Sequence, residues 1–221
     1  MTLTIRPATA ADSPALSRIC LVTGDAGASA EPLHKHGELL GLVWALPYVH
    51  IPDVTWGFVV ADDSAPDDHS TAAVKGYILG ASDTQAFEAK AEESWWPPLR
   101  AKYPLDASAA QSEVGKRTDA DTNYVKILHS APAPASEACL AWGPAHMHID
   151  LLPELQRQGW GRKLVDAAVK ELTVRGVDSL WLGMDPRNES ARQFYARLGF
   201  EPIDGAPASY MGLRFKNWKG A

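Results

Sequence analysis

The segment AHMHIDLL, at residues 145–152, constrains the fold more than any other part of the chain. Its apolar and polar residues alternate with the period of two that is typical of a β-strand. Three apolar side chains share one face and three polar ones share the other: Met147, Ile149 and Leu151 against His146, His148 and Asp150. Pro153 follows directly and ends the pattern, because proline has no N–H to give to a sheet. The sequence therefore predicts a strand here.

Helices and strands alternate after this segment. Residues 160–176, WGRKLVDAAVKELTVRG, predict a helix that closes at Arg175 and Gly176. Its predicted buried face consists of Leu164, Val165, Ala168, Val169 and Leu172. Residues 177–185 predict a strand, residues 188–200 a helix capped near Asn188 and closed by Gly199, and residues 209–216 a final strand. This alternation favours an α/β layer.

The first part of the chain is predicted from similar local patterns. LTIRP (3–7) indicates a short strand, followed by a helix with Asp12 or Ser13 as its cap and Pro14 just inside. Residues 24–32 predict a loop, and residues 36–49 are apolar at near-helical spacing and end before Pro52. Two strands are expected at 55–63 and 74–83, with a polar loop at 61–70 between them.

Residues 84–140 carry the weakest pattern. QAFEAKAEESWW (85–96) predicts a helix that ends at Pro97 and Pro98. The composition then turns to Ala, Ser, Asp and Pro, and residues 130–138 are expected to form a loop or linker. We expect 84–140 to be an insertion within a single domain that spans residues 1–221.

Composition narrows the class of protein. The chain is 46% hydrophobic and 22% charged, which allows a sizeable core. A formal net charge of -6 disfavours a nucleic-acid binder. Cys20 and Cys139, without a CxxC motif, indicate reduced thiols in a cytoplasmic protein, although one disulfide stays possible. The N-terminus has no signal-peptide pattern, and no apolar run is long enough to predict a membrane span.

The stretch QRQGWGRKL, at residues 156–164, places two glycines between the predicted strand and the predicted helix. A helix N-terminus offers N–H groups without intrahelical partners and the positive end of the helix dipole, so it can bind phosphate. Glycine removes the Cβ atoms that would keep a phosphate off the backbone, and Arg157, Arg162 and Lys163 add charge. The stretch suits a pyrophosphate, but an ordinary loop before a surface helix is equally compatible with the glycines. Neither GxxxxGK(S/T) nor GxGxxG occurs at this turn, which disfavours a nucleoside triphosphate and a dinucleotide.

Three motifs, in this order along the chain, resemble the GCN5-related N-acetyltransferase (GNAT) superfamily. TIRPATAAD is similar to its typical opening, Gln156-x-x-Gly159-x-Gly161 resembles its acyl-CoA pyrophosphate motif, and NESARQFYARLGF is similar to its N-x-x-A-x-x-F-Y-x-x-x-G-F ending. The resemblance covers residues 1–20 and 145–216. It implies an α/β fold, layered as α+β, with a central mixed, mostly antiparallel, twisted sheet flanked by helices and with the insertion before the central strand.

Within that superfamily, HKHGELLGLVWALPYV and HIDLLPELQRQGWGRKL resemble most the stand-alone bacterial and fungal relatives of the acetyltransferase-like C-terminal domain of O-GlcNAcase. The acetyltransferase activity of that domain is doubtful, so the resemblance leaves two functions open. One is an acetyl-CoA-dependent N-acetyltransferase that moves an acetyl group to a primary amine by direct attack in a ternary complex. The other is a catalytically weak or inactive module of the same fold that binds CoA or a peptide or protein partner.

The resemblance implies acetyl-CoA as cosubstrate and assigns residues to it. Backbone groups from Ile149 to Leu151 would pair with the pantetheine arm, and the turn up to Arg162 would cradle the pyrophosphate. Trp160 would pack on the cofactor or cover the helix start, and Asn188 would contact the cofactor or cap its helix. The full expected set is Ile149, Asp150, Leu151, Gln156, Arg157, Gln158, Gly159, Trp160, Gly161, Arg162, Asn188, Phe194 and Tyr195.

Acetyl transfer from a thioester to an amine needs a neutral amine, and the departing thiolate benefits from a proton. The resemblance implies Tyr195 as the general acid, with an aromatic core residue beside Phe194 as the alternative. A general base is expected on the polar face of the 145–152 strand, Asp150 first and then His148, with His146 further out. The alternative is three polar groups on a half-solvated strand face. Many members of the family work without a dedicated base.

The acceptor is expected to be a primary amine on a small molecule or on a lysine side chain. By family position, residues 36–49 border its groove, and the candidates to recognise it are His36, Glu38, Trp44 and Asp25. Trp95 and Trp96 would line that groove or anchor the insertion. No metal is expected, because the cluster at residues 34–38 has no second group of ligands at metal spacing. A monomer and a homodimer both stay open.

Overall fold

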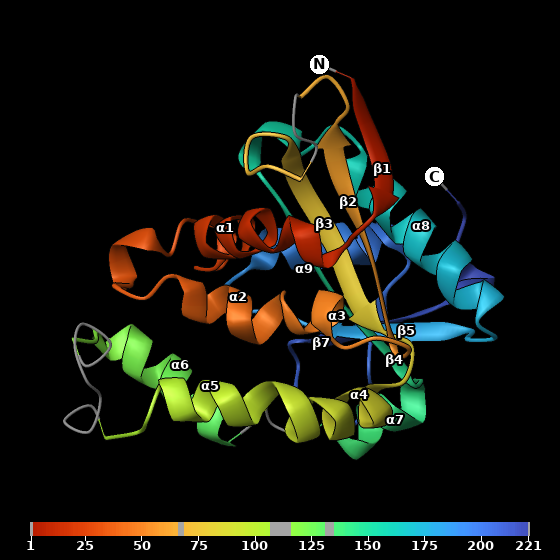
Figure 1. Ribbon diagram of the computed structural model, residues 1–221. Helices are drawn as coiled ribbons and strands as arrows, with labels where there is room; N and C mark the ends of the chain where they lie inside the picture. Colours follow the sequence, from red (N-terminus) through yellow and green to blue (C-terminus); the bar gives the residue numbers. More distant parts are fainter. Residues whose placement is uncertain (1, 66–68, 107–115, 131–134, 221) are drawn as a thin grey trace.

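The computed structural model describes residues 2–65, 69–106, 116–130 and 135–220. Within them, a seven-stranded sheet runs in the order β1-β2-β3-β4-β5-β7-β6 (Figure 1). β4 and β5 are parallel, whereas the other neighbouring pairs are antiparallel. The strands are β1 (Leu3–Pro7), β2 (Thr55–Asp62), β3 (Val74–Ala81), β4 (Ala145–Leu151), β5 (Ser179–Gly183), β6 (Glu201–Pro202) and β7 (Tyr210–Arg214). The predicted mixed, mostly antiparallel sheet is confirmed, and the short β6 is an addition to it.

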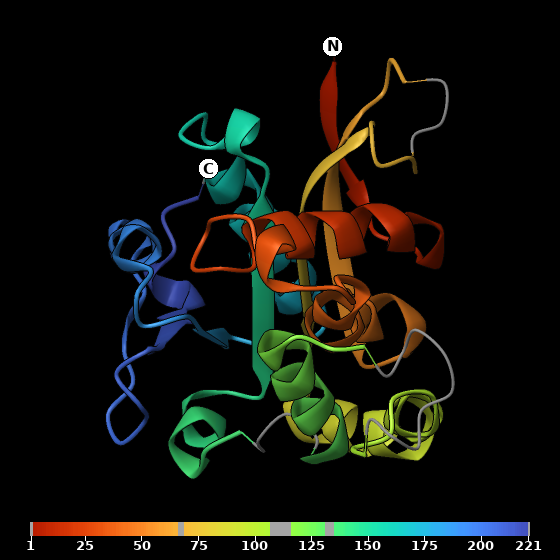
Figure 2. The same cartoon turned by 90° about the vertical axis from the view of Figure 1, so that its left-hand side faces the viewer.

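Helices cover both faces of this sheet (Figure 1, Figure 2). One face packs against α1 (Ser13–Thr23), α2 (Glu38–Trp44) and α3 (Pro47–His50), and the other against α8 (Trp160–Val174) and α9 (Glu189–Leu198). Because side chains alternate along a strand, neighbouring residues of one strand pack into two different hydrophobic cores, one on each face of the sheet. Tyr77 and Leu79 enter the core under α1, whereas Ile78 enters the core under α8.

The two C-terminal helices follow their sequence patterns. All five apolar positions predicted for the buried face of α8 are at most 7% exposed. The Asn188 side chain caps α9 by accepting a hydrogen bond from the Ala191 N–H at 3.0 Å. Gly199 then ends α9 with a φ of 93°, a conformation that glycine adopts without strain.

Among the described residues, four helices begin within 84–140 and lie along the lower edge of the molecule in Figure 1. They are α4 (Thr84–Lys90), α5 (Trp96–Lys102), α6 (Asp119–Ser130) and α7 (Glu137–Trp142), with a π-helical turn at Ala91–Trp95. The predicted stop at Pro97 and Pro98 is wrong, because both prolines lie in the first turn of α5, where the missing N–H has no intrahelical acceptor. Of the loops expected at 61–70 and 130–138, residues 66–68 and 131–134 lie outside the described residues.

Two other local predictions hold only in part. The single helix predicted over 36–49 is split into α2 and α3, because Pro47 in a continuous helix would clash with the carbonyl four residues earlier. Asp12 is the N-cap residue of α1, as predicted, but its side chain makes no capping hydrogen bond to the helix. Asp12 is fully buried and instead accepts hydrogen bonds from the Arg6 guanidinium, at 2.7 and 3.0 Å, and from the Thr9 N–H at 2.8 Å.

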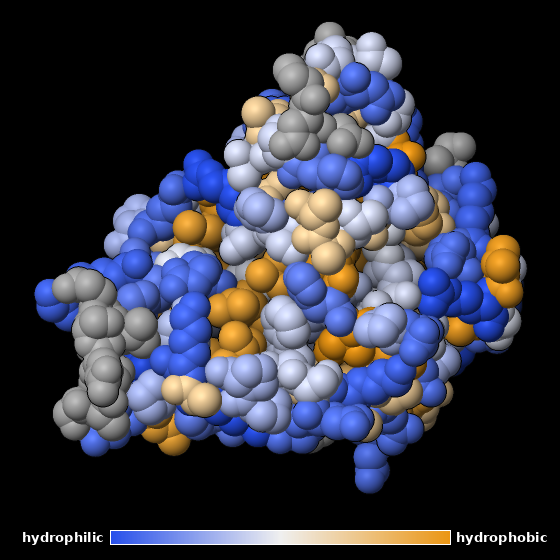
Figure 3. Space-filling view, viewed as in Figure 1, coloured by the Kyte–Doolittle hydropathy of each residue, from blue (hydrophilic) through white to orange (hydrophobic). Residues whose placement is uncertain are grey.

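Apolar side chains gather in the middle of the face seen in Figure 3, in the region between α1 and α5. The partly buried side chains that pack on the core under α1 include Leu42, Leu46 and Trp95. None of the described helices combines the length and the apolar character that crossing a membrane requires.

Candidate functional site

β4 and β5 lie side by side only at their beginnings. β4 pairs with β5 at Ala145 and His146, but it stays paired with β3 on its other side as far as Leu151. From Met147 onward, the edge of β4 that faces β5 therefore has no strand partner among the described residues. Apart from the Leu151 carbonyl, which accepts a hydrogen bond from the Gln156 amide, the backbone N–H and C=O groups of that edge are available to a ligand. A cavity of about 210 Å³ lies beside it.

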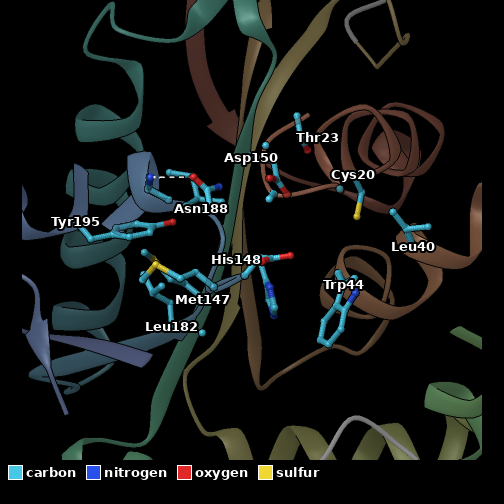
Figure 4. Close-up of a pocket in the computed structure, with 18 of the residues that line it drawn as sticks. Cys20, Thr23, Leu40, Trp44, Met147, His148, Asp150, Leu182, Asn188 and Tyr195 are labelled. Atoms are coloured by element: carbon cyan, nitrogen blue, oxygen red, sulfur yellow. Dashed lines mark hydrogen bonds between the residues drawn. The ribbon is translucent and has the colours of Figure 1, made fainter. Parts of the chain in front are cut away.

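Side chains from three directions enclose the cavity (Figure 4). His148 and Asp150 project from β4. Tyr195 enters from α9, with its hydroxyl toward the centre, and Trp44 stands on the opposite side. The cavity thus lies where the α1–α2 layer, the central strand and α9 meet, and these segments are far apart in the sequence.

Asp150 is a carboxyl with a shifted acidity. Burial raises the pKa of Asp150 to about 6, and the hydrogen bond from the Tyr77 hydroxyl, with a smaller contribution from nearby Thr23, offsets part of that rise. A carboxyl with a pKa close to neutrality is charged at physiological pH and can still take a proton.

Tyr195 presents a protonated hydroxyl to the same space. Its side chain is 7% exposed, and its hydroxyl has no hydrogen-bond partner among the described residues. Burial, and then the charge of Asp150, raise the pKa of Tyr195 well above its usual value. The hydroxyl therefore keeps its proton across the neutral range, as a proton donor must.

The two histidines of β4 differ in position. His148 lines the cavity, whereas His146 is 6% exposed and is packed among Tyr48, Phe87 and Trp181. Burial lowers the pKa of His146 to about 3 and that of His148 to about 4, so both imidazoles are neutral at physiological pH. Of the three polar residues of this strand face, His146 is buried, whereas His148 and Asp150 are half-buried; the half-solvated face expected as the alternative is thus wrong only for His146.

The glycine-containing turn links β4 to α8. Gly159 is the N-cap of α8 with a φ of +84°, and Arg157 before it has a φ of +60°. The first intrahelical hydrogen bond runs from the Lys163 N–H to the Gly159 carbonyl at 3.1 Å, which leaves the N–H groups of residues 160–162 without an intrahelical acceptor. Residues 156–159 are exposed. The turn has the geometry of an accessible anion cradle.

Gly161 has a packing role. It is buried, and a Cβ atom at this position would lie 2.8 Å from Cζ of Phe194 on α9. The absent Cβ therefore allows α8 and α9 to approach each other. Gly159 is the glycine of the pair with open space around it, since a Cβ atom there would meet nothing within 4 Å.

The polar side chains of the turn have specific contacts. The Gln156 amide donates to the Leu151 carbonyl at 3.1 Å, which ties the turn to the end of β4. The Gln158 amide donates to the Glu154 carbonyl. Arg162 donates from Nε to the Gly220 carbonyl at 2.8 Å and stacks on Trp218, so its charge is directed to the chain end. Arg157 is exposed.

Trp160 and Phe194 belong to the packing around this turn. Trp160 packs against the core under α8 and carries the Lys163 ammonium 4.1 Å above its ring. Phe194 lies against Tyr195 with 5.3 Å between the ring centroids. Both rings thus support the start of α8 and the position of the tyrosine.

An ion-pair bridge crosses one border of the cavity. Arg187 binds Asp25, from the loop after α1, at 2.8 Å and Asp185, from the loop after β5, at 2.7 Å. Asp185 and Asn188 both line the cavity. Asp25 is therefore held to the α9 side of the cavity and does not line it.

The residues expected to recognise an acceptor are only partly at the cavity. Trp44 lines it, whereas His36 lies 3.6 Å from Glu38, and Glu38 accepts a hydrogen bond from Tyr103 at 2.8 Å, away from the cavity. Trp95 donates to the Leu42 carbonyl at 2.9 Å and Trp96 is 2% exposed. Both tryptophans anchor the 84–140 segment.

His34 is fixed by a carboxylate instead of belonging to a metal cluster. His34 Nδ1 lies 2.8 Å from Asp121 Oδ1, and Asp121 also accepts from the Lys35 N–H at 3.1 Å. The described residues contain no group of three or more His, Cys, Asp or Glu side chains arranged to hold a metal ion.

Sequence reasoning missed most of the wall opposite α9. Cys20, Thr23, Leu40 and Tyr124 line the cavity, and Tyr77 reaches Asp150 from β3. No motif marks these residues. Only the pairing of β3 with β4, which places Tyr77 beside Asp150, brings the tyrosine to the site.

Three comparisons with known proteins agree with this geometry. A family model described as the acetyltransferase (GNAT) family matches residues 131–200. The ribosomal protein bS18-alanine N-acetyltransferase of Escherichia coli (strain K12) is 46% identical over 53 residues, which is 24% of this chain and 36% of the bacterial enzyme. The match thus spans about a third of that relative's length.

Solved structures match over nearly the whole chain. The crystal structure of SsHAT is 33% identical, with a TM-score of 0.79, and the match covers 97% of this chain and 99% of that one. Arabidopsis thaliana NAA60 in complex with acetyl-CoA has a TM-score of 0.51 at 13% identity, with coverage of 97% and 99%. The second similarity shows a shared fold alone.

Proposed function

The chain belongs to the GNAT acetyltransferase superfamily, and on this premise we propose that it transfers an acetyl group from acetyl-CoA to a primary amine. The observation that carries the proposal is the opening between β4 and β5, which joins an exposed helix N-terminus to a cavity with a carboxyl and a protonated tyrosine. The amine attacks the thioester directly while both substrates are bound.

The cofactor would lie along the open edge of β4. Ile149, Asp150 and Leu151 would offer backbone groups to the pantetheine arm, and residues 156–162 would hold the pyrophosphate at the start of α8. Asn188, Phe194 and Tyr195 would border the acetyl end from α9. This path is supported by the missing strand partner of β4 and by the free N–H groups of the α8 start.

The chemistry needs two proton transfers. The ammonium of the acceptor loses a proton to the Asp150 carboxylate, and the neutral amine nitrogen then forms a bond to the acetyl carbon while the carbon–sulfur bond breaks. Tyr195 gives its hydroxyl proton to the departing thiolate. The pKa of about 6 at Asp150 fits a base near neutral pH, and the raised pKa of Tyr195 keeps its hydroxyl protonated there. His148 is the second candidate for the base.

The acceptor would carry its amine on a small molecule or on a lysine side chain. It would enter from the side of Trp44 and Tyr124, where aromatic rings and the Asp150 carboxylate favour a cation. The protein would act as a monomer or a homodimer, and the 84–140 segment would be an insertion within a single domain.

The test is binding of acetyl-CoA, CoA and dephospho-CoA by isothermal calorimetry, followed by an amine screen. Gly159→Leu should weaken binding by roughly tenfold or more, because it blocks charged hydrogen bonds to phosphate. Gly176→Leu is the matched control. Gly176 has a φ of +78°, and a Cβ atom there would likewise meet nothing within 4 Å, so that variant carries the same backbone strain at the other end of α8.

Equal binding by the two variants would exclude the turn as the phosphate site. Binding of acetyl-CoA without transfer to any amine of a broad panel would support the inactive CoA-binding module in place of the enzyme.

A further inference from the structure

Four hydrogen-bonded side chains form a continuous chain that ends at the wall of the cavity. It connects Thr84 on α4, His146 on β4, Tyr48 on α3 and His148 on β4. Thr84 Oγ1 lies 2.7 Å from His146 Nδ1, the Tyr48 hydroxyl oxygen 2.7 Å from His146 Nε2, and the same oxygen 3.0 Å from His148 Nε2. The direction of each hydrogen bond follows from which atoms can donate.

A carbonyl fixes the first hydrogen. Thr84 Oγ1 lies 2.7 Å from the Pro144 carbonyl oxygen, which has no hydrogen to give, so the Thr84 hydroxyl donates to it. A hydroxyl has a single hydrogen. Toward His146 the Thr84 oxygen is therefore an acceptor, and His146 Nδ1 must carry a hydrogen.

The number of hydrogens on each group also determines the direction of the next two hydrogen bonds. Because burial keeps His146 neutral, its Nε2 is a bare acceptor and receives the Tyr48 hydroxyl hydrogen. The Tyr48 oxygen then has no hydrogen left for His148, so it accepts one from His148 Nε2. Because burial also keeps His148 neutral, Nδ1 of His148 carries a free lone pair.

That lone pair is next to the cavity. His148 lines the cavity, and its ring projects from β4 toward Trp44 (Figure 4). Nδ1 has no partner among the described residues, and it is not among their fully buried unpaired atoms. The rings of Trp44 and Tyr48, 5.6 and 5.3 Å from the imidazole, hold its orientation.

We propose that this chain locks His148 with its hydrogen on Nε2, so that Nδ1 accepts an N–H hydrogen bond from the acceptor amine. The proposal rests on the proposed function. His148 and Asp150 lie on the same face of β4, roughly 7 Å apart along the strand. Asp150 takes the proton that the ammonium loses, and His148 Nδ1 turns the nitrogen lone pair toward the acetyl carbon. Tyr48, His146 and Thr84 are positioning residues, which act through His148 and do not touch substrate.

The first measurement reads the hydrogen positions directly and needs no activity. The full chain, labelled with ¹⁵N-histidine, is studied by two-bond ¹H–¹⁵N correlation spectra, with His148→Asn to assign the signals. We expect His146 in the Nδ1–H form and His148 in the Nε2–H form from pH 6 to 8. Tyr48→Phe should turn the His148 signal into a mixture of the two forms. Finding His148 in the Nδ1–H form, or no change in Tyr48→Phe, overturns the proposal.

The second measurement tests whether Nδ1 or Nε2 of His148 is the atom that the reaction needs. In His148→Asn the amide oxygen can stand in the place of Nδ1, whereas in His148→Gln the amide reaches the place of Nε2. We expect His148→Asn to keep at least roughly tenfold more kcat/KM for the amine than His148→Gln, the size of one hydrogen bond. The opposite order overturns the proposal.

Tyr48→Phe should lower kcat/KM for the amine by roughly tenfold and leave the Kd of acetyl-CoA unchanged. Tyr103→Phe is the matched control, because Tyr103 is equally buried and its hydroxyl donates to Glu38, away from the cavity. Equal effects of the two variants on kcat/KM overturn the positioning role.

Failure of the proposed function is distinguishable from failure of this inference. Suppose that the protein transfers no acetyl group, but that the His148 signal shows the Nε2–H form and changes in Tyr48→Phe. The hydrogen-bond chain is then confirmed and the proposed function is wrong. If transfer occurs and His148 is in the Nδ1–H form, the function stands and the inference falls.

Discussion

Replacing Asp150 with Asn should stabilise the fold and weaken the enzyme at the same time. The folded protein holds a carboxylate at a half-buried position beside Tyr77, and the partial loss of water is the largest influence on its pKa. Asn has the same shape, and its amide oxygen can still accept the Tyr77 hydrogen bond. The substitution thus removes the cost of burying a charge and keeps the neighbouring contact.

The size of the effect follows from the pKa of Asp150, which burial raises from 3.8 to about 6. Such a rise corresponds to about 3 kcal/mol between the two protonation states. Between these two pKa values the folded state binds more protons than the unfolded state, so stability falls as the pH rises through this window. The cost is absent below pH 3.8 and complete above about pH 6. Asp150→Asn should therefore gain up to about 3 kcal/mol over the natural chain at pH 8 and little of it at pH 4.

Urea unfolding, followed by tryptophan fluorescence at pH values from 4 to 8, measures the difference between the two chains. Asp204→Asn, at an exposed position, reports what the loss of one negative charge does by itself. A difference for Asp150→Asn that stays flat with pH would refute the buried-carboxylate reasoning. In the same preparation, kcat/KM for the amine should fall about 10²- to 10⁴-fold if Asp150 is the base.

Three further substitutions test separate parts of the structure. Tyr195→Phe should lower kcat about 10²- to 10⁴-fold and leave both the Kd of acetyl-CoA and the unfolding free energy unchanged, because the hydroxyl has no partner among the described residues; an unchanged kcat in steady-state assays would remove Tyr195 as the acid. Gly161→Ala should cost about 1–3 kcal/mol in urea unfolding, since its Cβ would press on Phe194, and the added Phe194→Leu should recover part of that loss; equal stability of Gly161→Ala and the natural chain would contradict the packing argument. Arg6→Ala should cost about 1–3 kcal/mol in urea unfolding, because Asp12 is fully buried and loses the guanidinium but keeps its contacts with His69 and the Thr9 N–H. Equal stability of Arg6→Ala and the natural chain would contradict this role of the ion pair.

The sequence predicts the part of the fold that is encoded by local periodicity. The alternation of 145–152 and the apolar face of 160–176 specify β4 and α8 because each pattern has a single period over many residues. The cap at Asn188 and the closing Gly199 specify α9 in the same way, since both act on their own helix. These three elements surround the α9 side of the cavity.

The segment 84–140 could not be predicted because tertiary contacts hold it. α6 is tied to the chain before α2 by the buried carboxylate of Asp121, which accepts from the Lys35 and His36 N–H groups at 3.1 and 3.3 Å. An aspartate in a polar stretch does not indicate such a contact. The prolines of α5 led to a wrong prediction of a helix end, because a proline can also occupy the first turn of a helix.

The wall of the cavity opposite α9 could not be predicted either, because tertiary contacts bring its residues together. Tyr48 lies about a hundred residues before His148 in the sequence, yet its hydroxyl is 3.0 Å from the imidazole. Tyr77 meets Asp150 only through the register of β3 against β4. Tyr195 on α9 could be predicted as a site residue because a motif carries it, whereas Tyr48 and Tyr77, which contact His148 and Asp150, belong to no motif.

The two glycines of QRQGWGRKL therefore differ as indicators of function. Gly161 must stay small in any protein that packs α8 against Phe194, whether or not it binds CoA. Gly159 has open space around it and a φ that the turn alone requires, and the same conformation recurs at Gly176, at the other end of α8. Retention of both glycines is thus weak support for a working phosphate site, because packing and backbone conformation explain each of them. The stronger support comes from two other features: the edge of β4 that no described strand covers, and the half-buried Asp150, whose charge lowers the stability of the fold. A carboxylate that destabilises the fold above pH 6 is expected to persist only where its charge is used.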